Sequence, residues 1–445
     1  MRIKHHRQGR LSSFQIIIGG FLAVILMGAF ILMLPISSRS GEVTPFIDAL
    51  FTATSATCVT GLVVFDTASY WSYFGQAVIL ILIQIGGMGV ITIAAAVTMI
   101  SGKKIGLMQR STMKEAIAGP NVGGIVGLTK LVIKATLLIE LAGAALMMPV
   151  FIKDHGLRGI WMAFFHAISA FCNAGFDLMG TPEAPFVSLT GYTTHPLINV
   201  VIMLLIILGG IGFLTWQDVC THKLRLRKYR LQSKVILITS ALLIVIPSLL
   251  FFIFEYRDFT LSERIWSAIF QSVTARTAGF NSADLTLFGE GALVLMMFLM
   301  LVGGSPGSTA GGMKTTTVAV LFSSAVSVFR KKKHVPMLNR RISDETVKNA
   351  SAILLLYLTF FVVGGVIISV IEDLPLMTCL FETASAIATV GLTLGITPAL
   401  STASHVILIV LMFIGRIGCL TLIYATFKSN EANTSKNPME QINVG

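Results

Sequence analysis

Residues 165–176 read FHAISAFCNAGF and place small and polar side chains (Ser169, Cys172, Asn173 and Gly175) inside a chain that is 54% hydrophobic. The apolar segment that holds them, Gly159–Gly175, is too short and too interrupted to cross a membrane, because a spanning helix needs about 20 apolar residues. The stretch is therefore predicted to be half a helix that ends in a polar glycine turn.

The chain as a whole is predicted to be a multi-pass membrane protein. Only 12% of its 445 residues are charged, which is too little to cover the surface of a soluble domain. Eight apolar segments are interpreted as membrane spans, the sixth of them interrupted. They are Phe14–Leu34, Gln76–Ile100, Ile125–Phe151, Leu197–Leu214, Val235–Phe254, Ala292–Val302 with Thr316–Val328, Ala352–Ile371 and Val406–Phe427.

The net charge of +12 is distributed unevenly along the chain. If the N-terminus is inside, Lys and Arg concentrate in the inner segments, above all in the loops 103–114, 223–234 and 330–348. The outer loops carry only Arg39, Lys153, Arg158, Arg257 and Arg264. This bias predicts that both termini are cytoplasmic. The basic clusters are interpreted as topology signals and contacts for anionic lipid, not as a nucleic-acid site.

The opening stretch recurs along the chain. Its four copies are FTATSATCVTGL (51–62), FHAISAFCNAGF (165–176), FQSVTARTAGF (270–280) and FETASAIATVGL (381–392). After each copy comes a span with a second glycine mark: IGGMG (85–89), LGGIG (208–212), VGGSPG (302–307) and IGRIG (414–418). These copies divide the chain into repeats at 1–102, 103–221, 222–334 and 335–427, followed by a cytoplasmic tail at 428–445.

The repeated half-helix predicts a pore. A helix that dips into a membrane and returns as extended chain leaves carbonyls unpaired, which is tolerated only where they are buried in protein or line a water-filled path. Four such elements around one axis would form a ring of carbonyl oxygens that can replace the hydration shell of a potassium ion, and their helix C-termini would favour a cation. Glycine permits the positive φ and close approach that the turn needs. The predicted filter residues are Cys58, Val59, Thr60 and Gly61; Cys172, Asn173, Ala174 and Gly175; Arg276, Thr277, Ala278 and Gly279; and Ala388, Thr389, Val390 and Gly391.

These motifs carry a resemblance to a known family. With CVTG, CNAG, RTAG and ATVG in the four turns and GGSPGSTAGGMK in the interrupted sixth span, residues 14–427 resemble the membrane subunit of the Trk/Ktr/HKT potassium-transporter superfamily, of the bacterial KtrB type. The resemblance implies an all-α polytopic fold of four pseudo-repeats of helix, re-entrant pore helix and helix around a central pore. In that family a serine at the first filter glycine is associated with sodium selectivity, so four glycines favour potassium. Each turn nevertheless departs from the potassium-channel sequence TVGYG.

The same resemblance implies a function and partners. The function is potassium uptake across the bacterial inner membrane, with no covalent cofactor and with Na⁺ as an activator. The implied partners are a second copy of the chain in a homodimer and a cytosolic nucleotide-binding ring of the KtrA type.

The segment GGSPGSTAGGMKTTT (303–317) is expected just below the filter, where the other repeats are expected to continue as uninterrupted helix. Irregular backbone at membrane depth that faces a cavity predicts a gate across the conduction path. Arg416, in the fourth glycine mark, is expected at the same depth, in contact with free carbonyls of this loop. The predicted gate residues are Gly303, Gly304, Ser305, Pro306, Gly307, Ser308, Thr309, Ala310, Gly311, Gly312, Lys314 and Arg416.

Three alternatives stay open at this point. Arg416 could only brace two helices. The repeats could also build a secondary symporter with alternating access. Residues 303–307 fit G-x-S-x-G and would suit a hydrolase built on Ser305, but no His/Asp pair is visible and no enzyme is expected.

Several single residues also carry expectations. His166 is expected to make a local hydrogen bond, and Arg276 to point behind the filter toward an acidic residue. Cys58 and Cys172 are interpreted as small apolar fillers. The five cysteines show neither metal-ligand spacing nor a disulfide framework.

Overall fold

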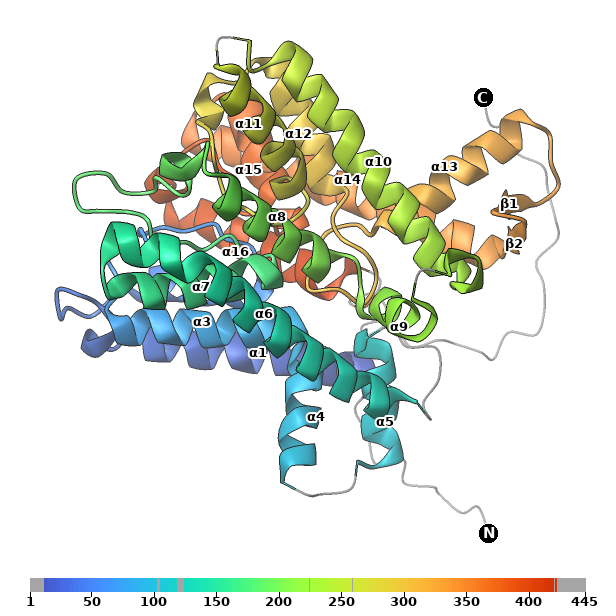
Figure 1. Ribbon diagram of the computed structural model, residues 1–445, viewed down its shortest axis with the longest axis horizontal. Coiled ribbons are helices and arrows are strands. Elements are labelled where there is room, and N and C mark those ends of the chain that lie inside the picture. The colour runs from blue at the N-terminus through green and yellow to red at the C-terminus, as the bar shows by residue number, and fades with distance from the viewer. Residues whose placement is uncertain are drawn as a thin grey trace.

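The computed structural model describes residues 12–101, 105–117, 124–223, 225–257, 259–419 and 421. The basic N-terminal segment 1–10, Lys103, Lys104 and the predicted tail 428–445 lie outside these residues. The predicted helical membrane fold is confirmed, and each repeat contributes a long first helix, a short buried helix and a second helix (Figure 1).

The first helix of each repeat is long and apolar. These helices are α1 (Ser13–Leu32), α6 (Ile125–His155), α10 (Leu231–Phe254) and α14 (Asp344–Glu372). Each is long enough to cross a membrane, and only 22% to 33% of their most apolar windows is buried inside the protein. Most of their apolar side chains therefore point outward, as helices in contact with lipid require.

The four copies of the opening motif form the short helices α2 (Phe46–Cys58), α7 (Arg158–Cys172), α11 (Leu261–Thr274) and α15 (Leu376–Ala388). Half or more of the residues in each of these helices are buried, and the last residues of each are almost inaccessible to solvent. A capping box starts α11, because the Thr260 hydroxyl accepts from the Glu263 N–H while the Glu263 carboxylate accepts from the Thr260 N–H. The C-terminal ends of the four short helices therefore lie in the interior of the protein.

The second helices are α3 (Tyr73–Met88), α8 (Pro196–Gly210), α12 (Glu290–Leu301) and α16 (Thr402–Ile417). The expectation that the second helix is uninterrupted outside the third repeat is wrong. The chain bends by 95° between α3 and α4 (Val90–Ile100), and by 98° between α8 and α9 (Phe213–His222). The glycines at the two bends, Gly89 and Gly212, have φ of 84° and 93°, a conformation that other residues adopt only with strain.

The third repeat replaces this bend with a loop, between α12 and α13 (Thr315–Phe329). Beyond it, a small antiparallel hairpin of β1 (Val335–Met337) and β2 (Arg340–Ile342) pairs Val335 with Ile342, an addition to the all-α fold that was expected. The remaining described elements are α5 (Leu107–Ile117) and the 3₁₀ helices Pro35–Ser37, Thr190–Tyr192, Leu226–Lys228, Leu285–Leu287 and Thr397–Ala399.

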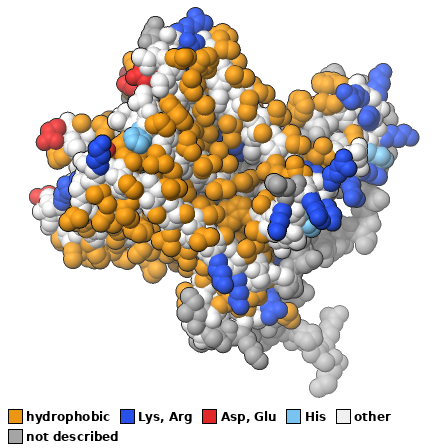
Figure 2. All heavy atoms as spheres, viewed as in Figure 1, with side chains coloured by type: hydrophobic (Ala, Val, Ile, Leu, Met, Phe, Trp, Pro, Cys, Tyr) orange, Lys and Arg blue, Asp and Glu red, His pale blue; other side chains and the backbone are white. Residues whose placement is uncertain are grey.

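Charge is distributed unevenly over the surface (Figure 2). Apolar side chains form a broad band across the visible face. Most of the visible Lys and Arg gather at the right and lower margins, over α5, α9, α13 and the β1–β2 hairpin, and the visible acidic groups lie toward the left and upper left. An apolar band between margins of different charge suits a chain that crosses a bilayer.

Candidate ion pathway

The four turn glycines meet in a closed ring. Their φ angles are all positive: 96° at Gly61, 70° at Gly175, 81° at Gly279 and 94° at Gly391. A Cβ added to any of them would strike the carbonyl oxygen of the residue that precedes the turn glycine of the next repeat. For Gly61, Gly175, Gly279 and Gly391 these are the carbonyl oxygens of Ala174, Ala278, Val390 and Thr60, respectively. Neither the backbone conformation nor the space admits a side chain.

A second left-handed residue precedes each turn glycine by two positions. These are Val59, Asn173, Thr277 and Thr389, with φ between 53° and 68°. For a residue other than glycine this conformation costs roughly 1–2 kcal/mol. Such strain persists only where the surrounding structure holds it, and it gathers at functional sites. The same strained turn therefore occurs four times around one ring.

Each short helix supplies a hydroxyl that holds this turn, which the sequence analysis missed. Ser55 and Ser385 accept from the N–H of Gly61 and Gly391, at 3.1 and 3.0 Å. Ser169 and Thr274 instead donate to the carbonyls that follow the turn glycines. The signal was present in the sequence, because all four hydroxyls are the fifth residue of their motif copy.

In the second, third and fourth motifs the residue that follows the first Phe supports the segment beyond the turn, whereas the hydroxyl of Thr52 in the first motif has no hydrogen-bond partner among the described residues. The His166 ring donates to Met162 O at 2.7 Å and accepts from the Leu178 N–H at 3.4 Å, so the predicted local hydrogen bond is confirmed. Gln271 contacts Asn281 in the same way, and the Glu382 carboxylate accepts from the hydroxyls of Thr393 and Thr397. These contacts fix the chain where it leaves the ring.

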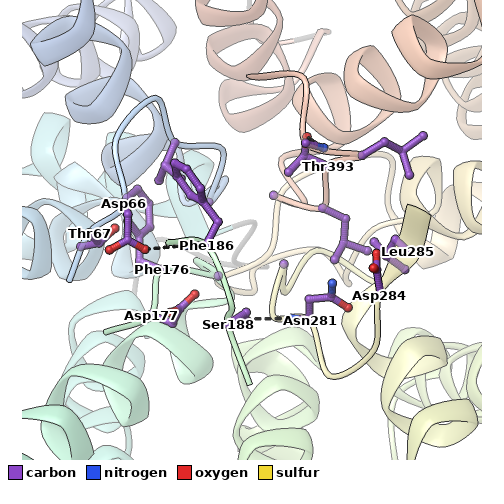
Figure 3. A pocket seen from close by; sticks show the side chains of 18 of the residues that line it. Asp66, Thr67, Phe176, Asp177, Phe186, Ser188, Asn281, Asp284, Leu285 and Thr393 are labelled. Atoms are coloured by element: carbon purple, nitrogen blue, oxygen red, sulfur yellow. Dashed lines mark hydrogen bonds between the residues drawn. The ribbon is translucent and has the colours of Figure 1, made fainter. Parts of the chain in front are cut away.

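A cavity of about 210 Å³ opens above the ring and is lined by the four turn glycines and by Asp66, Asp177 and Asp284 (Figure 3). Burial, with a smaller effect from the negative charge of Asp66, raises the pKa of Asp177 to about 7. Carboxylates around a cavity attract cations and raise their local concentration. The cavity therefore suits the entry of a cation.

The segment 181–189 of the second repeat crosses this cavity. The Phe186 N–H donates to the Asp66 carboxylate of the first repeat at 3.0 Å, and the Asn281 N–H of the third repeat donates to Ser188 Oγ at 3.1 Å (Figure 3). Phe186 and Ser188 both have positive φ. The segment thus ties three repeats together at the mouth of the ring.

Arg276 does point away from the ring, but among the described residues the expected acidic partner is not found. Its guanidinium donates to Ser240 Oγ on α10 at 3.2 Å, and in the described part of the chain its Nε has no partner. The side chain is buried. A small cavity of about 20 Å³ adjoins it, lined by Asn173 and Gly304 among others, so the charge sits between the filter segment of the second repeat and the loop of the third.

The loop between α12 and α13 lies directly under the ring. Cβ atoms on Gly303 and Gly311 would run into Thr277 and Thr389, the left-handed residues of the third and fourth turns. Backbone hydrogen bonds join the loop to the end of α8, from the N–H groups of Ser305 and Thr309 to the carbonyls of Gly210 and Gly209. The loop is thus held against the second, third and fourth repeats.

The predicted gate residues divide by burial. Gly303, Gly304, Ser305, Thr309, Ala310, Gly311 and Gly312 are buried, whereas Pro306, Gly307, Ser308, Lys314 and Arg416 are partly exposed. Ser305 is fully buried, with its hydroxyl 3.1 Å from that of Thr315. A buried serine paired with a threonine has neither the base nor the access that a nucleophile needs.

Two cations meet the loop from below. The Arg416 guanidinium donates to Thr309 O in the loop and to Gly86 O and Gly87 O at the end of α3. The Lys314 ammonium donates to Ala310 O at 2.8 Å and to Gly311 O at 3.2 Å. Both side chains line a cavity of about 230 Å³ on the far side of the loop from the ring. A cation leaving the ring would meet two positive charges and a polar loop.

Glu140, in the span α6, has found partners on other elements. Its carboxylate accepts from Gln84 Nε2 at 3.3 Å and lies 3.9 Å from the thiol of Cys172. Cys172 and Cys58 are fully buried. The carboxylate is thus placed behind the second turn.

Comparison with known proteins agrees with this architecture. Residues 4–436 match the TrkH family, described as cation transport protein. The chain is 41% identical to the "Potassium/sodium uptake protein NtpJ" of Enterococcus hirae, over 100% of this chain and 99% of that protein. It is also 41% identical to the "Ktr system potassium uptake protein B" of Bacillus subtilis, over 94% of each.

The fold is shared with a solved structure. The potassium transporter TrkH from Vibrio parahaemolyticus superposes with a TM-score of 0.73 at 20% identity, over 95% of this chain and 86% of that chain. With the family match over nearly its whole length, the chain belongs to the TrkH family of cation transport proteins, is of the KtrB type within it, and is a multi-pass membrane transporter, not an enzyme.

Proposed function

We propose that the protein takes up potassium ions through the ring formed by Gly61, Gly175, Gly279 and Gly391. The observation that carries this proposal is the closure of the ring. Each turn glycine packs against the carbonyl oxygen of the residue that precedes the turn glycine of the next repeat. Four left-handed turns at the C-terminal ends of four buried helices place partial negative charge around one centre. The names of the two relatives, which are potassium and potassium/sodium uptake proteins, support the same ion.

The loop 303–312, with Lys314 and Arg416, is proposed to be the gate. It occupies the inner side of the ring, and two cations hold its carbonyls. The predicted filter and gate residues thus form one path, from the acidic outer cavity through the ring to the loop. Sodium is proposed as an activator or second transported ion, in line with the name of the Enterococcus hirae relative.

The partners proposed for this chain are a second copy of itself and a cytosolic nucleotide-binding ring. The Bacillus subtilis relative is named as part of a Ktr system. We place the protein in the bacterial inner membrane with its basic side in the cytoplasm, because the described loops with the most Lys and Arg lie on the side of the gate.

Ion flux tests the proposal. Purified protein is reconstituted into vesicles, and the uptake of K⁺, Rb⁺ and Na⁺ is compared under the same gradient. Flux that scales with the driving force and prefers K⁺ and Rb⁺ to Na⁺ is expected. Saturating flux with a fixed stoichiometry to a second ion would instead identify a symporter, and equal flux of the three ions would remove the potassium filter.

A further inference from the structure

Thr309 is the point at which the gate loop touches the candidate filter through a side chain. It is fully buried. Its hydroxyl lies 3.0 Å from Phe171 O and 3.1 Å from Asn173 Oδ1. Phe171 is in the last turn of α7, and Asn173 is the left-handed residue two positions before Gly175. The loop therefore contacts the strained turn of the second repeat directly.

The contact at Thr309 survives either orientation of the Asn173 amide. A hydroxyl has one hydrogen, so Thr309 can donate to only one of two carbonyl-type oxygens. Exchanging Oδ1 and Nδ2 of Asn173 lets Thr309 donate to Phe171 O and accept from the amide nitrogen. In both orientations the Asn173 amide lies within hydrogen-bond distance of the Thr309 hydroxyl.

The same amide extends the network to the third repeat. Asn173 Nδ2 lies 3.4 Å from Thr277 Oγ1, and Thr277 is the left-handed residue two positions before Gly279. One buried side chain thus joins the turns of two repeats, and Thr309 supports that side chain from the loop.

The backbone of Thr309 is held by different partners. Its N–H donates to Gly209 O at 3.2 Å, and its carbonyl accepts from Arg416. A displacement of the loop that separates Thr309 from Arg416 would also move its hydroxyl away from Asn173, because both groups belong to one residue. The position of the loop and the support of the filter are therefore mechanically linked.

We propose that Thr309 is a specificity-determining residue that acts through Asn173. It holds the filter segments of the second and third repeats in the ring geometry. The preference for K⁺ over Na⁺ therefore depends on whether the gate loop is in contact with the filter. This inference rests on the proposed filter and gate and adds a coupling between them. Coupling of this kind is reciprocal, so the ion in the filter also biases the loop.

The test measures the ratio of K⁺ to Na⁺ flux in reconstituted vesicles. Thr309→Val removes the hydroxyl at nearly constant volume and is expected to lower the ratio by roughly fivefold or more, the lower bound of typical couplings between sites. Thr309→Ser keeps the hydroxyl and is expected to retain most of the preference. Thr136→Val is the matched control, since Thr136 is buried on α6 and its hydroxyl has no partner among the described residues.

Two further variants separate the coupling from general damage. Ser308→Ala removes a bond inside the loop, from Ser308 Oγ to Ser305 O at 2.7 Å, and is expected to change flux without changing the ratio. In a double-mutant cycle, Thr309→Val is expected to have no further effect on the ratio in an Asn173→Ala background. Thermal unfolding confirms that each variant is folded.

The outcomes distinguish this inference from the proposed function. A wild-type protein that does not discriminate K⁺ from Na⁺ would overturn the filter itself. A selective wild type with an unchanged ratio in Thr309→Val, or with additive effects of Thr309→Val and Asn173→Ala, would overturn the coupling and leave the filter and gate in place.

Discussion

Gly391 packs against the carbonyl group of Thr60, so that the last repeat closes on the first. The other three contacts of the ring follow the order of the chain, but this one joins its two ends. If each contact contributes equally to the filter, substituting the turn glycine should reduce ion discrimination to a similar extent in every repeat.

Replacing any turn glycine by serine is therefore expected to weaken the preference for K⁺ over Na⁺. Gly391→Ser adds a Cβ where Thr60 O lies and forces a left-handed conformation that costs roughly 1–2 kcal/mol. We expect the K⁺/Na⁺ flux ratio to fall about tenfold, which corresponds to about 1.4 kcal/mol. Gly41→Ser is the control, because Gly41 has a φ of 74° but open space around it. Unchanged discrimination in all four single variants would contradict the filter assignment.

The hydroxyls at the fifth motif position are expected to act on the same ratio. Ser385→Ala leaves the N–H of Gly391 without its partner, and a lost buried hydrogen bond costs about 1–3 kcal/mol. We expect reduced discrimination and a lower melting temperature. Thr54→Val is the matched control, since the Thr54 hydroxyl is buried on α2 and lacks a partner in the described chain. An effect of Thr54→Val as large as that of Ser385→Ala would mean that the hydroxyl itself is not the cause.

The sequence predicted the four short helices well because their signal is local and repeated. Phe and glycine recur at nearly fixed spacing in four copies, and each copy forms a short helix that ends in a turn at its glycine. The bends at Gly89 and Gly212 were not predicted, because counting apolar residues along a span ignores the backbone angles that glycine allows. The partner of Arg276 could not be predicted either, since it depends on the packing of α10 against the third turn.

The direction of the hydroxyl contacts lay equally beyond the sequence. Ser385 accepts from a backbone N–H, whereas Thr274, at the same motif position, donates to a carbonyl. The third copy is one residue shorter before its glycine and its helix ends in a right-handed cap residue, Ala275, but Ser169 in the full-length second copy also donates to a carbonyl, so the spacing does not set the direction. Whether such a hydroxyl accepts from an N–H or donates to a carbonyl depends on the orientation of a single peptide group, which the sequence does not specify.

Uptake is expected to depend on external pH through Asp177. Its raised pKa of about 7 means that this carboxyl is ionised at pH 8 and mostly neutral at pH 6. Losing one negative charge in the outer cavity should raise the KM for K⁺ about two- to fivefold, because a nearby charge in a wet site is worth about 0.5–1 kcal/mol. Initial rates of Rb⁺ uptake at the two pH values measure the effect.

Two variants identify the group that is responsible for this pH effect. Asp177→Asn is expected to give the high KM at both pH values. Asp284→Asn removes a charge from the same cavity and is expected to raise the KM while the pH dependence remains. A pH dependence that persists in Asp177→Asn would assign it to another group.

The basic inner loops are expected to dock the cytosolic partner. Arg227, Lys228, Arg340 and Arg341 are all exposed, the last two on strand β2. Changing these four to Glu should abolish co-purification of the partner, because like charges would then face a surface that complements Lys and Arg. The control reverses Lys153, in the last turn of α6, and Arg257, just beyond α10, which are both exposed on the opposite side. A partner that still co-purifies with the fourfold variant would show that it binds elsewhere.

Removing Arg416 is expected to open the gate. The guanidinium joins the loop at Thr309 to the end of α3 at Gly86 and Gly87, and an arginine within a membrane helix persists only with such partners or water because its insertion costs at least about 2.5–3.5 kcal/mol. In Arg416→Ser the loop loses this anchor and the path loses a positive charge. We expect basal K⁺ flux to rise about tenfold or more, equivalent to about 1.4 kcal/mol, and to depend less on the cytosolic partner. Shortening the segment 307–311 should have the same effect.

The alternative is that Arg416 only braces two helices. Tyr357→Phe tests this, because the Tyr357 hydroxyl donates to Gly415 O at 3.3 Å and joins α14 to α16 without touching the loop. If Arg416 is part of the gate, Tyr357→Phe should alter stability but leave K⁺ flux dependent on the cytosolic partner. Arg416→Ser should make K⁺ flux less dependent on that partner. If both variants lower flux in proportion to the folded protein, with partner dependence retained, the arginine is a brace. Loss of a structural brace can only reduce the amount of folded protein. A rise in K⁺ flux per folded molecule in Arg416→Ser would therefore show that Arg416 acts in the gate.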